Sequence, residues 1–215
     1  MTKLTCHISI SLDGFVAGPN QSEENPLGEG GELLHGWMVP LGAWRESHGA
    51  QGGDVNESTR IMEETLENVG AGVMGRSMFG PVGGGEWGDG QWKGWWGDDP
   101  PYHNDVFILT HHSRDPVEME GGTTFHFVTD GIDAALRCAA DAAGGRDIRL
   151  GGGVATIRQY LQAGLIDEMH LAMSPTLLGS GEPLLAGLDL PKLGYRCAEH
   201  VPTPNATHVV LTKQP

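Results

Sequence analysis

Hydrophobic and polar residues alternate strictly near the start of the chain. The apolar residues occupy every second position: Leu4, Cys6, Ile8, Ile10 and Leu12. A period of two predicts a β-strand over residues 4–12 with one apolar and one polar face. Turn-forming residues follow at 13–20, and acidic, glycine-rich sequence continues to Gly31. A loop of this length at the end of a strand is typically either functional or disordered.

Further along, short apolar runs alternate with stripes of helical period. The apolar runs predict strands at 72–75, 106–109, 124–128, 148–150, 169–173, 195–201 and 207–212, the last two forming a hairpin. The stripes predict helices at 32–38, from a capping box at 54–57 to Val69, from a cap at Asp130 to Gly144, and at 154–161, with a helical turn at 76–79. Residues 42–53 show no clear period. This alternation over 215 residues predicts one α/β domain, 1–215, with a mostly parallel sheet that binds ligands at the carboxyl ends of its strands.

The charge balance limits the partners of the chain. Lys and Arg total 13 against 28 Asp and Glu, which gives a net charge of −15. This balance argues against nucleic acid and against an anionic membrane surface as the main partner. No apolar run approaches membrane-spanning length, and the first residues run directly into the strand at 4–12. We therefore expect a cytoplasmic protein that acts on a small molecule.

The cysteines and histidines bear on disulfide and metal chemistry. Cys6, Cys138 and Cys197 are far apart and lie in apolar or strand-like settings, which predicts free, buried thiols. The chain has ten histidines, but none form a helical pair four residues apart, and the neighbours His111 and His112 point apart in a strand or loop. We expect no metal site.

Three consecutive glycines, Gly151–Gly153, separate the strand at 148–150 from the helix at 154–161. Glycines at the end of a strand let the backbone approach a ligand, and the following helix directs its unpaired N–H groups at it. The pattern therefore predicts a phosphate cradle. An ordinary strand-to-helix turn also uses one or two glycines, but a third has no steric role there. The spacing lacks the last glycine of a Rossmann turn and the Lys-Ser/Thr of a P-loop, so another fold is indicated.

A second strand–glycine–helix motif carries an arginine. It consists of the strand at 72–75 followed by Arg76 and Ser77. In a chain this acidic, a guanidinium at the start of a helix favours a phosphate contact, because it binds two oxygens at once. The alternative is a surface salt bridge. A third polar cluster, 110–114, follows the strand at 106–109 and is either a further phosphate contact or a hydrophilic turn before Pro116.

The stretch 83–101 holds four of the six tryptophans among glycines and aspartates. It matches no regular element. Three interpretations stay open: a mobile lid, an aromatic wall for a flat ligand, or packing over a sheet edge or against a second subunit.

Four motifs in order make the chain resemble the dihydrofolate reductase-like superfamily. They are Ser-Leu-Asp-Gly-Phe-Val-Ala-Gly at 11–18, Val-Met-Gly-Arg-Ser at 73–77, Leu-Thr-His at 109–111 and Leu-Gly-Gly-Gly at 150–153. The chain looks closest to the branch with the C-terminal reductase domain of riboflavin biosynthesis. The resemblance implies a three-layer fold with a mixed, mostly parallel eight-stranded sheet and an antiparallel C-terminal hairpin. It also implies a homodimer that transfers a hydride from NADPH to a flat heterocycle such as a pterin, a folate or a pyrimidine.

The resemblance also assigns cofactor-binding residues. Gly75, Arg76 and Ser77 would hold phosphate oxygens. Thr110 and His111, with Arg114 in support, would surround the adenosine 2′-phosphate. The pyrophosphate and the nicotinamide side would meet Gly151, Gly152, Gly153 and Thr156, and Ala17 and Gly18 would line the nicotinamide ribose. Arg76, His111 and Arg114 are rare positive or protonatable groups in an acidic chain, and they predict a preference for NADPH over NADH.

The acceptor side departs from the family pattern. Folate enzymes carry a carboxylate on the first helix, and only Glu32 lies near that place. No Lys or Arg lies between the strand at 4–12 and Glu32 to bind a phosphoribosyl group. As proton donor we rank Glu32 ahead of Asp13 and His35, with a bound water as a further candidate. Each also has a structural explanation: Asp13 in a turn, Glu32 at a helix start, and His35 packed beside Trp37. The rival hypothesis is a ligand-binding protein that kept the fold without turnover.

Overall fold

The computed structural model describes residues 2–47, 49–88 and 90–214. The chain divides into two compact units, each built from two stretches of sequence. The first unit combines the chain up to Cys6 with Asn68–Asp167, and the second combines His7–Glu67 with the chain from Glu168 onward. Each unit has its own buried hydrophobic cluster.

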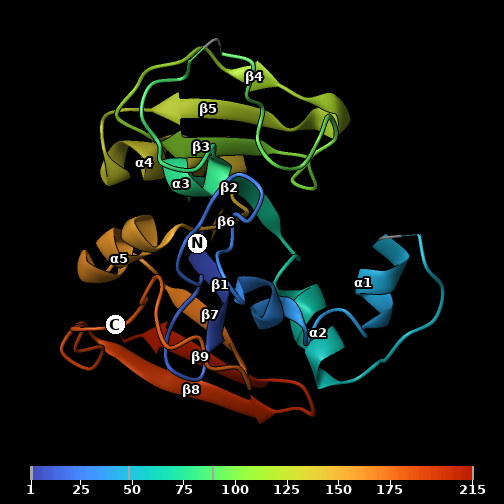
Figure 1. Cartoon of the computed structure of the whole chain (residues 1–215). Helices are drawn as coiled ribbons and strands as arrows, with labels where there is room; N and C mark the ends of the chain where they lie inside the picture. Colours follow the sequence, from blue (N-terminus) through green and yellow to red (C-terminus); the bar gives the residue numbers. More distant parts are fainter. Residues whose placement is uncertain (1, 48, 89, 215) are drawn as a thin grey trace. The chain divides into compact units, whose positions relative to one another are not determined.

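The described residues form nine strands (Figure 1). They are β1 (Leu4–Ser11), β2 (Val69–Gly75), β3 (Asp105–Leu109), β4 (Val117–Glu118), β5 (Thr124–Val128), β6 (Asp147–Leu150), β7 (Glu168–Ser174), β8 (Tyr195–Pro202) and β9 (Thr207–Lys213). In the first unit the strand order is β4-β5-β3-β2-β6-β1, and in the second it is β1-β7-β9-β8. The α/β class and the antiparallel terminal hairpin of β8 and β9 are confirmed. The sheet has one strand more than expected, because the two-residue β4 pairs antiparallel with β5.

Short helices connect the strands. They are the 3₁₀ helices η1 (Gly31–His35) and η2 (Glu120–Gly122), and the α-helices α1 (Gly42–Ser47), α2 (Glu57–Glu64), α3 (Arg76–Phe79), α4 (Ile132–Ala143) and α5 (Val154–Gln162). In the first unit α4 packs against β2 and β3 (Figure 1). No helix of the described chain is both long and apolar enough to cross a membrane.

Strand β1 differs from its prediction in length and in facing. It ends at Ser11, and Leu12 is 55% exposed. The polar residues Thr5, Ser9 and Ser11 are buried, so the strand has no solvent-facing polar side. The reason is that β1 is not an edge strand and that Trp37 donates a hydrogen bond to the buried Ser9.

The predicted capping box at 54–57 was wrong by two residues. Asn56 caps α2: its side chain accepts a hydrogen bond from the Ser58 N–H, and the Thr59 hydroxyl accepts one from the Asn56 N–H. The helix also ends at Glu64 rather than reaching Val69. Asn68 adopts a positive φ of 57°, which breaks the helical path, and the β-branched Val69 begins β2 instead.

Three further boundaries differ from the prediction. Gly131 rather than Asp130 is the N-cap of α4, with a φ of 84° that suits glycine, and no side chain caps it. The helix closes at Gly144 as predicted. The segment expected to be a helix at 32–38 is the shorter η1, and the segment without a clear period contains α1.

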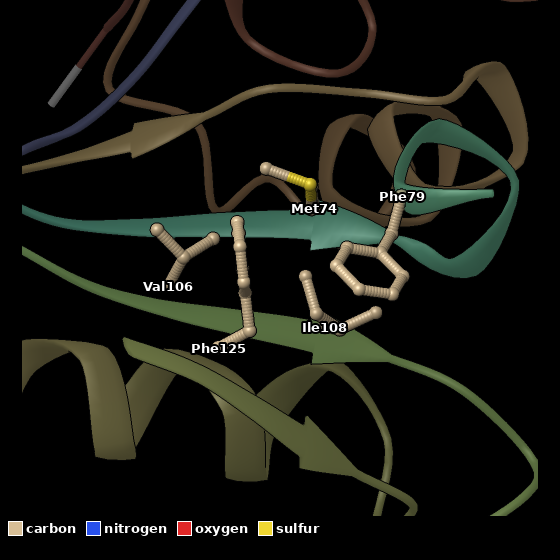
Figure 2. Packing of buried hydrophobic residues seen from close by; sticks show 5 residues of the cluster. All are labelled: Met74, Phe79, Val106, Ile108 and Phe125. Carbon is tan, nitrogen blue, oxygen red and sulfur yellow. The ribbon is translucent and has the colours of Figure 1, made fainter. Parts of the chain in front are cut away.

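The core of the first unit lies where β2, β3 and β5 meet α3. Its fully buried members are Met74, Phe79, Val106, Ile108 and Phe125. Figure 2 shows these five side chains gathered together, with the Phe79 ring beside Ile108. Side chains of the tryptophan-rich loop pack against this cluster. The cluster therefore anchors α3, which carries Arg76, onto β2, β3 and β5.

The second unit has a smaller core, which consists of Trp37, Leu41, Ala172 and Ala206. The Trp37 indole N–H donates to the Ser9 hydroxyl over 3.0 Å, which explains why a serine is buried in β1.

The three cysteines are free, as predicted, but only Cys6 is buried. Cys138 and Cys197 are exposed, contrary to the prediction, because one lies on the outer side of α4 and the other on the exposed β8. Burial raises the pKa of the Cys6 thiol to about 12, so Cys6 stays protonated and unreactive at neutral pH.

Candidate functional site

The two strand–glycine–helix motifs lie side by side in the first unit. Strands β2 and β6 are parallel neighbours with Val73 opposite Leu150, so Gly75 and Gly152, each two residues further along, meet at the same edge. The Gly75 N–H donates to the Gly152 carbonyl, and the Gly151 N–H donates to the Val73 carbonyl over 2.8 Å. The prediction that these motifs gather at carboxyl ends of parallel strands therefore holds for this pair.

Two glycines here have a definite steric role. A Cβ on Gly75 would lie 2.2 Å from the Thr156 hydroxyl oxygen, which is closer than any real contact. Gly152 has a φ of 144°, a conformation that side chains disfavour. Gly153 is the N-cap of the nine-residue α5, and no side chain caps its first N–H groups. The first turn of α5 therefore presents backbone donors beside a surface without Cβ atoms.

Arg76, the first residue of α3, is only 9% exposed and lies at this edge. Its Nη1 donates to the carbonyl oxygens of Gly80 and Pro81. Its Nε and Nη2 are buried and have no hydrogen-bond partner among the residues that the structure describes. These two donors form one edge of the guanidinium, the edge that binds a carboxylate or phosphate in bidentate fashion. An oxyanion-binding edge is therefore buried without an acceptor.

The electrostatics of Arg76 agree with an unmatched cation. Burial lowers the pKa of Arg76, and the positive charge of Arg114 lowers it further. Within the described ranges Arg76 forms no ion pair, so the surface salt bridge considered for it is absent there. Unsatisfied buried donors cost about 1–3 kcal/mol each, or more when charged, so their presence calls for an explanation.

Trp87 connects Arg76 with Arg114. The Cζ atoms of the two guanidiniums lie 3.9 and 5.0 Å from the centroid of the Trp87 ring. The Trp87 indole N–H donates to the His112 carbonyl over 2.8 Å. The Arg114 Nη2 donates to the Gly90 carbonyl over 2.7 Å. Its Nη1 is buried and has no partner among the described residues. The sequence did not single out Trp87, whose partners Arg76, His112 and Arg114 are distant from it in the chain.

The other three tryptophans of this stretch contact α3 and β5. The Trp92 indole N–H donates to the Phe79 carbonyl over 2.9 Å, and that of Trp95 donates to the Met78 carbonyl over 3.0 Å. Trp96 stacks on Phe125 with ring centroids 6.0 Å apart. These three tryptophans therefore pack on α3 and β5.

Of the remaining predicted cofactor residues of this unit, Thr110 and His111 follow β3, and Ser77 lies in α3. Leu109 pairs with Gly75, so Thr110 leaves the sheet at the same edge as Arg76. Thr110 is buried, and its hydroxyl accepts a hydrogen bond from the His112 N–H over 3.1 Å. His111 and Ser77 are exposed. The exits of β2, β3 and β6 thus bring together the predicted cofactor residues of this unit.

In the second unit, the predicted residues have mainly internal partners. Asp13 accepts hydrogen bonds from the Ser11 hydroxyl at 2.6 Å and from two backbone N–H groups, those of Gly179 at 2.6 Å and Leu178 at 3.1 Å. The Ser11 hydroxyl, followed by these backbone donors, lowers the pKa of Asp13. Asp13 is therefore an ionised anchor between two loops, which argues against it as a proton donor at neutral pH.

Ala17 and Gly18 are buried in a compact loop. A Cβ on Gly18 would lie 2.0 Å from the Glu29 carbonyl oxygen, and one on Gly181 would lie 2.0 Å from that of Ala17. The Gly18 N–H donates to the Leu27 carbonyl. This close backbone packing accounts for small residues at 17 and 18 within the unit itself.

Glu32 and His35 lie on η1. Glu32 is exposed, and His35 is half-buried with a pKa that burial lowers. A lowered pKa keeps His35 neutral at physiological pH, where a neutral imidazole is a weak proton donor. Among the three candidates, Glu32 is the exposed carboxyl group without a structural assignment.

A second buried polar cluster, in the second unit, was missed from the sequence. The Thr203 hydroxyl donates to the Ala206 carbonyl at 2.8 Å and accepts from Ser58 at 3.0 Å. Because the Ser58 proton is used there, the His208 Nε2 must donate to Ser58 over their 2.9 Å contact. The His170 Nε2 then donates to the His208 Nδ1 over 2.9 Å. The chain of donors is closed and ends on a carbonyl.

In the part of the chain that the structure describes, no group of three or more His, Cys, Asp or Glu side chains is placed to hold a metal ion. His170 and His208 use their facing nitrogens on each other rather than on a shared ligand.

Comparison with known proteins places the chain among reductase folds. The family model of the RibD C-terminal domain matches residues 2–209. A crystal structure from Shewanella sp. PV-4 with a provisional riboflavin-biosynthesis name has 20% identity and a TM-score of 0.62, and the match covers 100% of both chains. Dihydrofolate reductase from Enterococcus faecalis, complexed with NADP(H), has 12% identity and a TM-score of 0.52 over 99% of this chain and 97% of that one.

A third solved structure is a two-activity protein. It is the diaminohydroxyphosphoribosylaminopyrimidine deaminase/5-amino-6-(5-phosphoribosylamino)uracil reductase of Thermotoga maritima, with 10% identity and a TM-score of 0.53. The match covers 99% of this chain and 57% of that one. At such identities the likeness shows a shared fold. No curated protein matches the chain.

Proposed function

Because the chain belongs to the RibD C-terminal domain family, as its motifs predicted, we propose that it is an NADPH-dependent reductase of a small, flat acceptor. The observation that carries the proposal is the buried, unpartnered edge of Arg76 beside the glycine-lined exits of β2 and β6. A phosphate oxygen pair is the acceptor that such an edge fits.

The cofactor residues are proposed as the motifs imply. Arg76, with Gly75 and Ser77, would hold phosphate oxygens, and Arg114, with Thr110 and His111, would hold the 2′-phosphate. Gly151–Gly153 and Thr156 would meet the pyrophosphate through the first turn of α5. Ala17 and Gly18, which pack internally, are weaker candidates for the ribose.

When bound, NADPH supplies the hydride, and the residues of the chain bind, orient and shield it from water. The product also needs a proton, and Glu32 is the candidate that the geometry favours, because Asp13 is anchored and His35 is neutral. With a known acceptor, the Glu32→Gln variant should lose an ionisation from the pH profile of the hydride step while NADPH affinity stays intact. An unchanged profile would remove Glu32 and leave a bound water.

The proposed acceptor class rests on the names of the relatives and on the charges of this chain. The Thermotoga maritima and Enterococcus faecalis proteins are named for a phosphoribosylaminouracil and for dihydrofolate. This chain has no Lys or Arg between His7 and Trp44 and so lacks an evident phosphoribosyl contact there. We propose a pterin-like, folate-like or pyrimidine-like acceptor without fixing which. We further expect a cytoplasmic homodimer, which sedimentation of the purified protein would test.

The rival function is ligand binding without turnover. Titration with NADPH, followed by a turnover screen on dihydrofolate, pterins and small carbonyl compounds, separates the two. NADPH binding with turnover of one acceptor is the expected result. NADPH binding without any turnover would favour the rival, and no binding would exclude both.

A further inference from the structure

We propose that Trp87 is a positioning residue that holds Arg76 and Arg114 as a pair and thereby sets the preference for a cofactor with a 2′-phosphate. The inference rests on the proposed function, because it concerns the same cofactor. It assigns a role to a side chain outside the four motifs that carry the family resemblance.

The geometry begins with two cations on one aromatic ring. The guanidiniums of Arg76 and Arg114 lie 3.9 and 5.0 Å from the Trp87 centroid, within the range of cation–π attraction. Two like charges repel, and a carboxylate would ordinarily offset this. In the described part of the chain no carboxylate pairs with either arginine. Among the described residues, the ring of Trp87 lies against both guanidiniums, and that of Phe127 lies 5.1 Å from the Arg114 Cζ.

The ring is itself fixed in place. Its N–H donates to the His112 carbonyl at 2.8 Å, and its ring meets Phe79 and Phe127 edge-on at centroid distances of 5.8 and 4.7 Å. A ring held by three contacts defines where the stacked guanidiniums can lie. The unpartnered donors of both arginines are buried, and both guanidiniums lie against this one ring.

This arrangement is specific to Trp87 among the loop tryptophans. Trp92 and Trp95 bond to carbonyls of Phe79 and Met78 in the same way, but among the described residues the cation–ring contacts of Arg76 and Arg114 involve only Trp87 and Phe127. Trp95 therefore offers a matched control: the same loop, the same residue type and the same kind of hydrogen bond, without a guanidinium on its face.

The test compares Trp87→Leu, Trp87→Phe and Trp95→Leu by calorimetric titration with NADPH and NADH. Trp87→Leu should weaken NADPH binding about tenfold and NADH binding less than twofold, because only the 2′-phosphate needs the paired cations. Trp87→Phe keeps a ring face and should retain most of the NADPH affinity. Trp95→Leu should change the affinity ratio of the two cofactors by less than twofold. Circular dichroism melts verify that each variant is folded.

Other outcomes would overturn the inference. An equal loss for NADPH and NADH in Trp87→Leu, or a change of ratio as large in Trp95→Leu, would reduce Trp87 to a packing residue. Titration with adenosine 2′-monophosphate separates this inference from the proposed function. If wild type binds this nucleotide but not NADPH, and Trp87→Leu weakens that binding, the reductase proposal fails while the role of Trp87 stands. If wild type binds neither ligand, both fail.

Discussion

Two buried polar clusters, one in each unit, differ in how their hydrogen-bonding groups are satisfied. In the second unit, a chain of hydrogen bonds runs from His170 through His208, Ser58 and Thr203. Its last acceptor is the Ala206 carbonyl. In the first unit, Arg76 and Arg114 keep buried donors without acceptors. The cluster of the second unit is satisfied by its own hydrogen bonds, whereas the arginines of the first unit keep donors that an anion could satisfy.

The difference separates structural polar groups from ligand-binding ones. A cluster of histidines often indicates a functional site. Here the facing imidazole nitrogens of His170 and His208 bond to each other, and His208 also bonds to Ser58. An arginine near a surface usually indicates a salt bridge, yet Arg76 is nine-tenths buried with an empty bidentate edge. We therefore infer function from unmet hydrogen-bonding capacity rather than from residue type.

The largest expected effect comes from opening the closed cluster. His208→Ala removes a fully buried ring, takes the acceptor from the His170 Nε2 and takes the donor from the Ser58 hydroxyl oxygen, which should lower the free energy of unfolding by about 3–5 kcal/mol. His200→Ala, on the exposed β8, should change it by no more than about 0.5 kcal/mol. Urea unfolding measures both. A His208→Ala protein as stable as the His200→Ala protein would show that the chain of hydrogen bonds contributes nothing.

The same cluster predicts a pH dependence of stability. Burial, with a smaller effect of His208, lowers the pKa of His170 from the ordinary 6.5 to about 4, and burial also lowers the pKa of His208. The unfolded chain therefore binds protons that the folded chain does not. Stability from His170 is complete above pH 6.5 and falls as the pH drops toward about 4, by about 3 kcal/mol.

Urea unfolding between pH 7.5 and pH 4.5 tests this pH dependence against His170→Gln, which lacks the titrating group. Carboxylates contribute to the slope in both proteins, so the difference between the two slopes isolates His170. Equal slopes would contradict a buried, neutral His170.

A smaller effect is expected from crowding the other cluster. Gly75→Ala places a Cβ 2.2 Å from the Thr156 hydroxyl and should destabilise the protein by about 1–3 kcal/mol and weaken NADPH binding. Gly75→Ala combined with Thr156→Ala removes the contacting oxygen and should recover part of the stability lost in the single variant. Thermal unfolding and NADPH titration of the single and double variants measure this. Gly75→Ala with the stability and affinity of wild type would show that the close approach is not needed.

Much of the fold could be predicted because its signals are local. Strand period, the terminal hairpin and the glycine-flanked helices were confirmed in place. The errors at Leu12, Val69 and Asp130 arose where long-range pairing or one positive φ decided the boundary. No local pattern shows that β1 lies inside the sheet, and so its buried serines could not be predicted.

The candidate site divides in the same way. The glycines and Arg76 stand in contiguous motifs, and parallel pairing of neighbouring strands brings these motifs together. Trp87 meets its arginines through a loop without periodicity, and Ser58 meets His208 across 150 residues. Such contacts depend on the tertiary structure, which explains why the sequence alone did not reveal the contacts of Trp87 with the two arginines or the hydrogen bonds of the histidines.

The most direct test of the account is the NADPH affinity of Arg76→Gln, measured by isothermal titration calorimetry beside Arg137→Gln. Arg137 lies exposed on α4 in the same unit, so its substitution removes the same charge without touching the buried edge. A charge-assisted contact is worth about 1.5–3 kcal/mol, so Arg76→Gln should bind NADPH about ten- to a hundredfold more weakly than wild type, and Arg137→Gln within about twofold of it. NADPH affinity in Arg76→Gln equal to that in Arg137→Gln would contradict the claim that the unpartnered edge of Arg76 is a phosphate site.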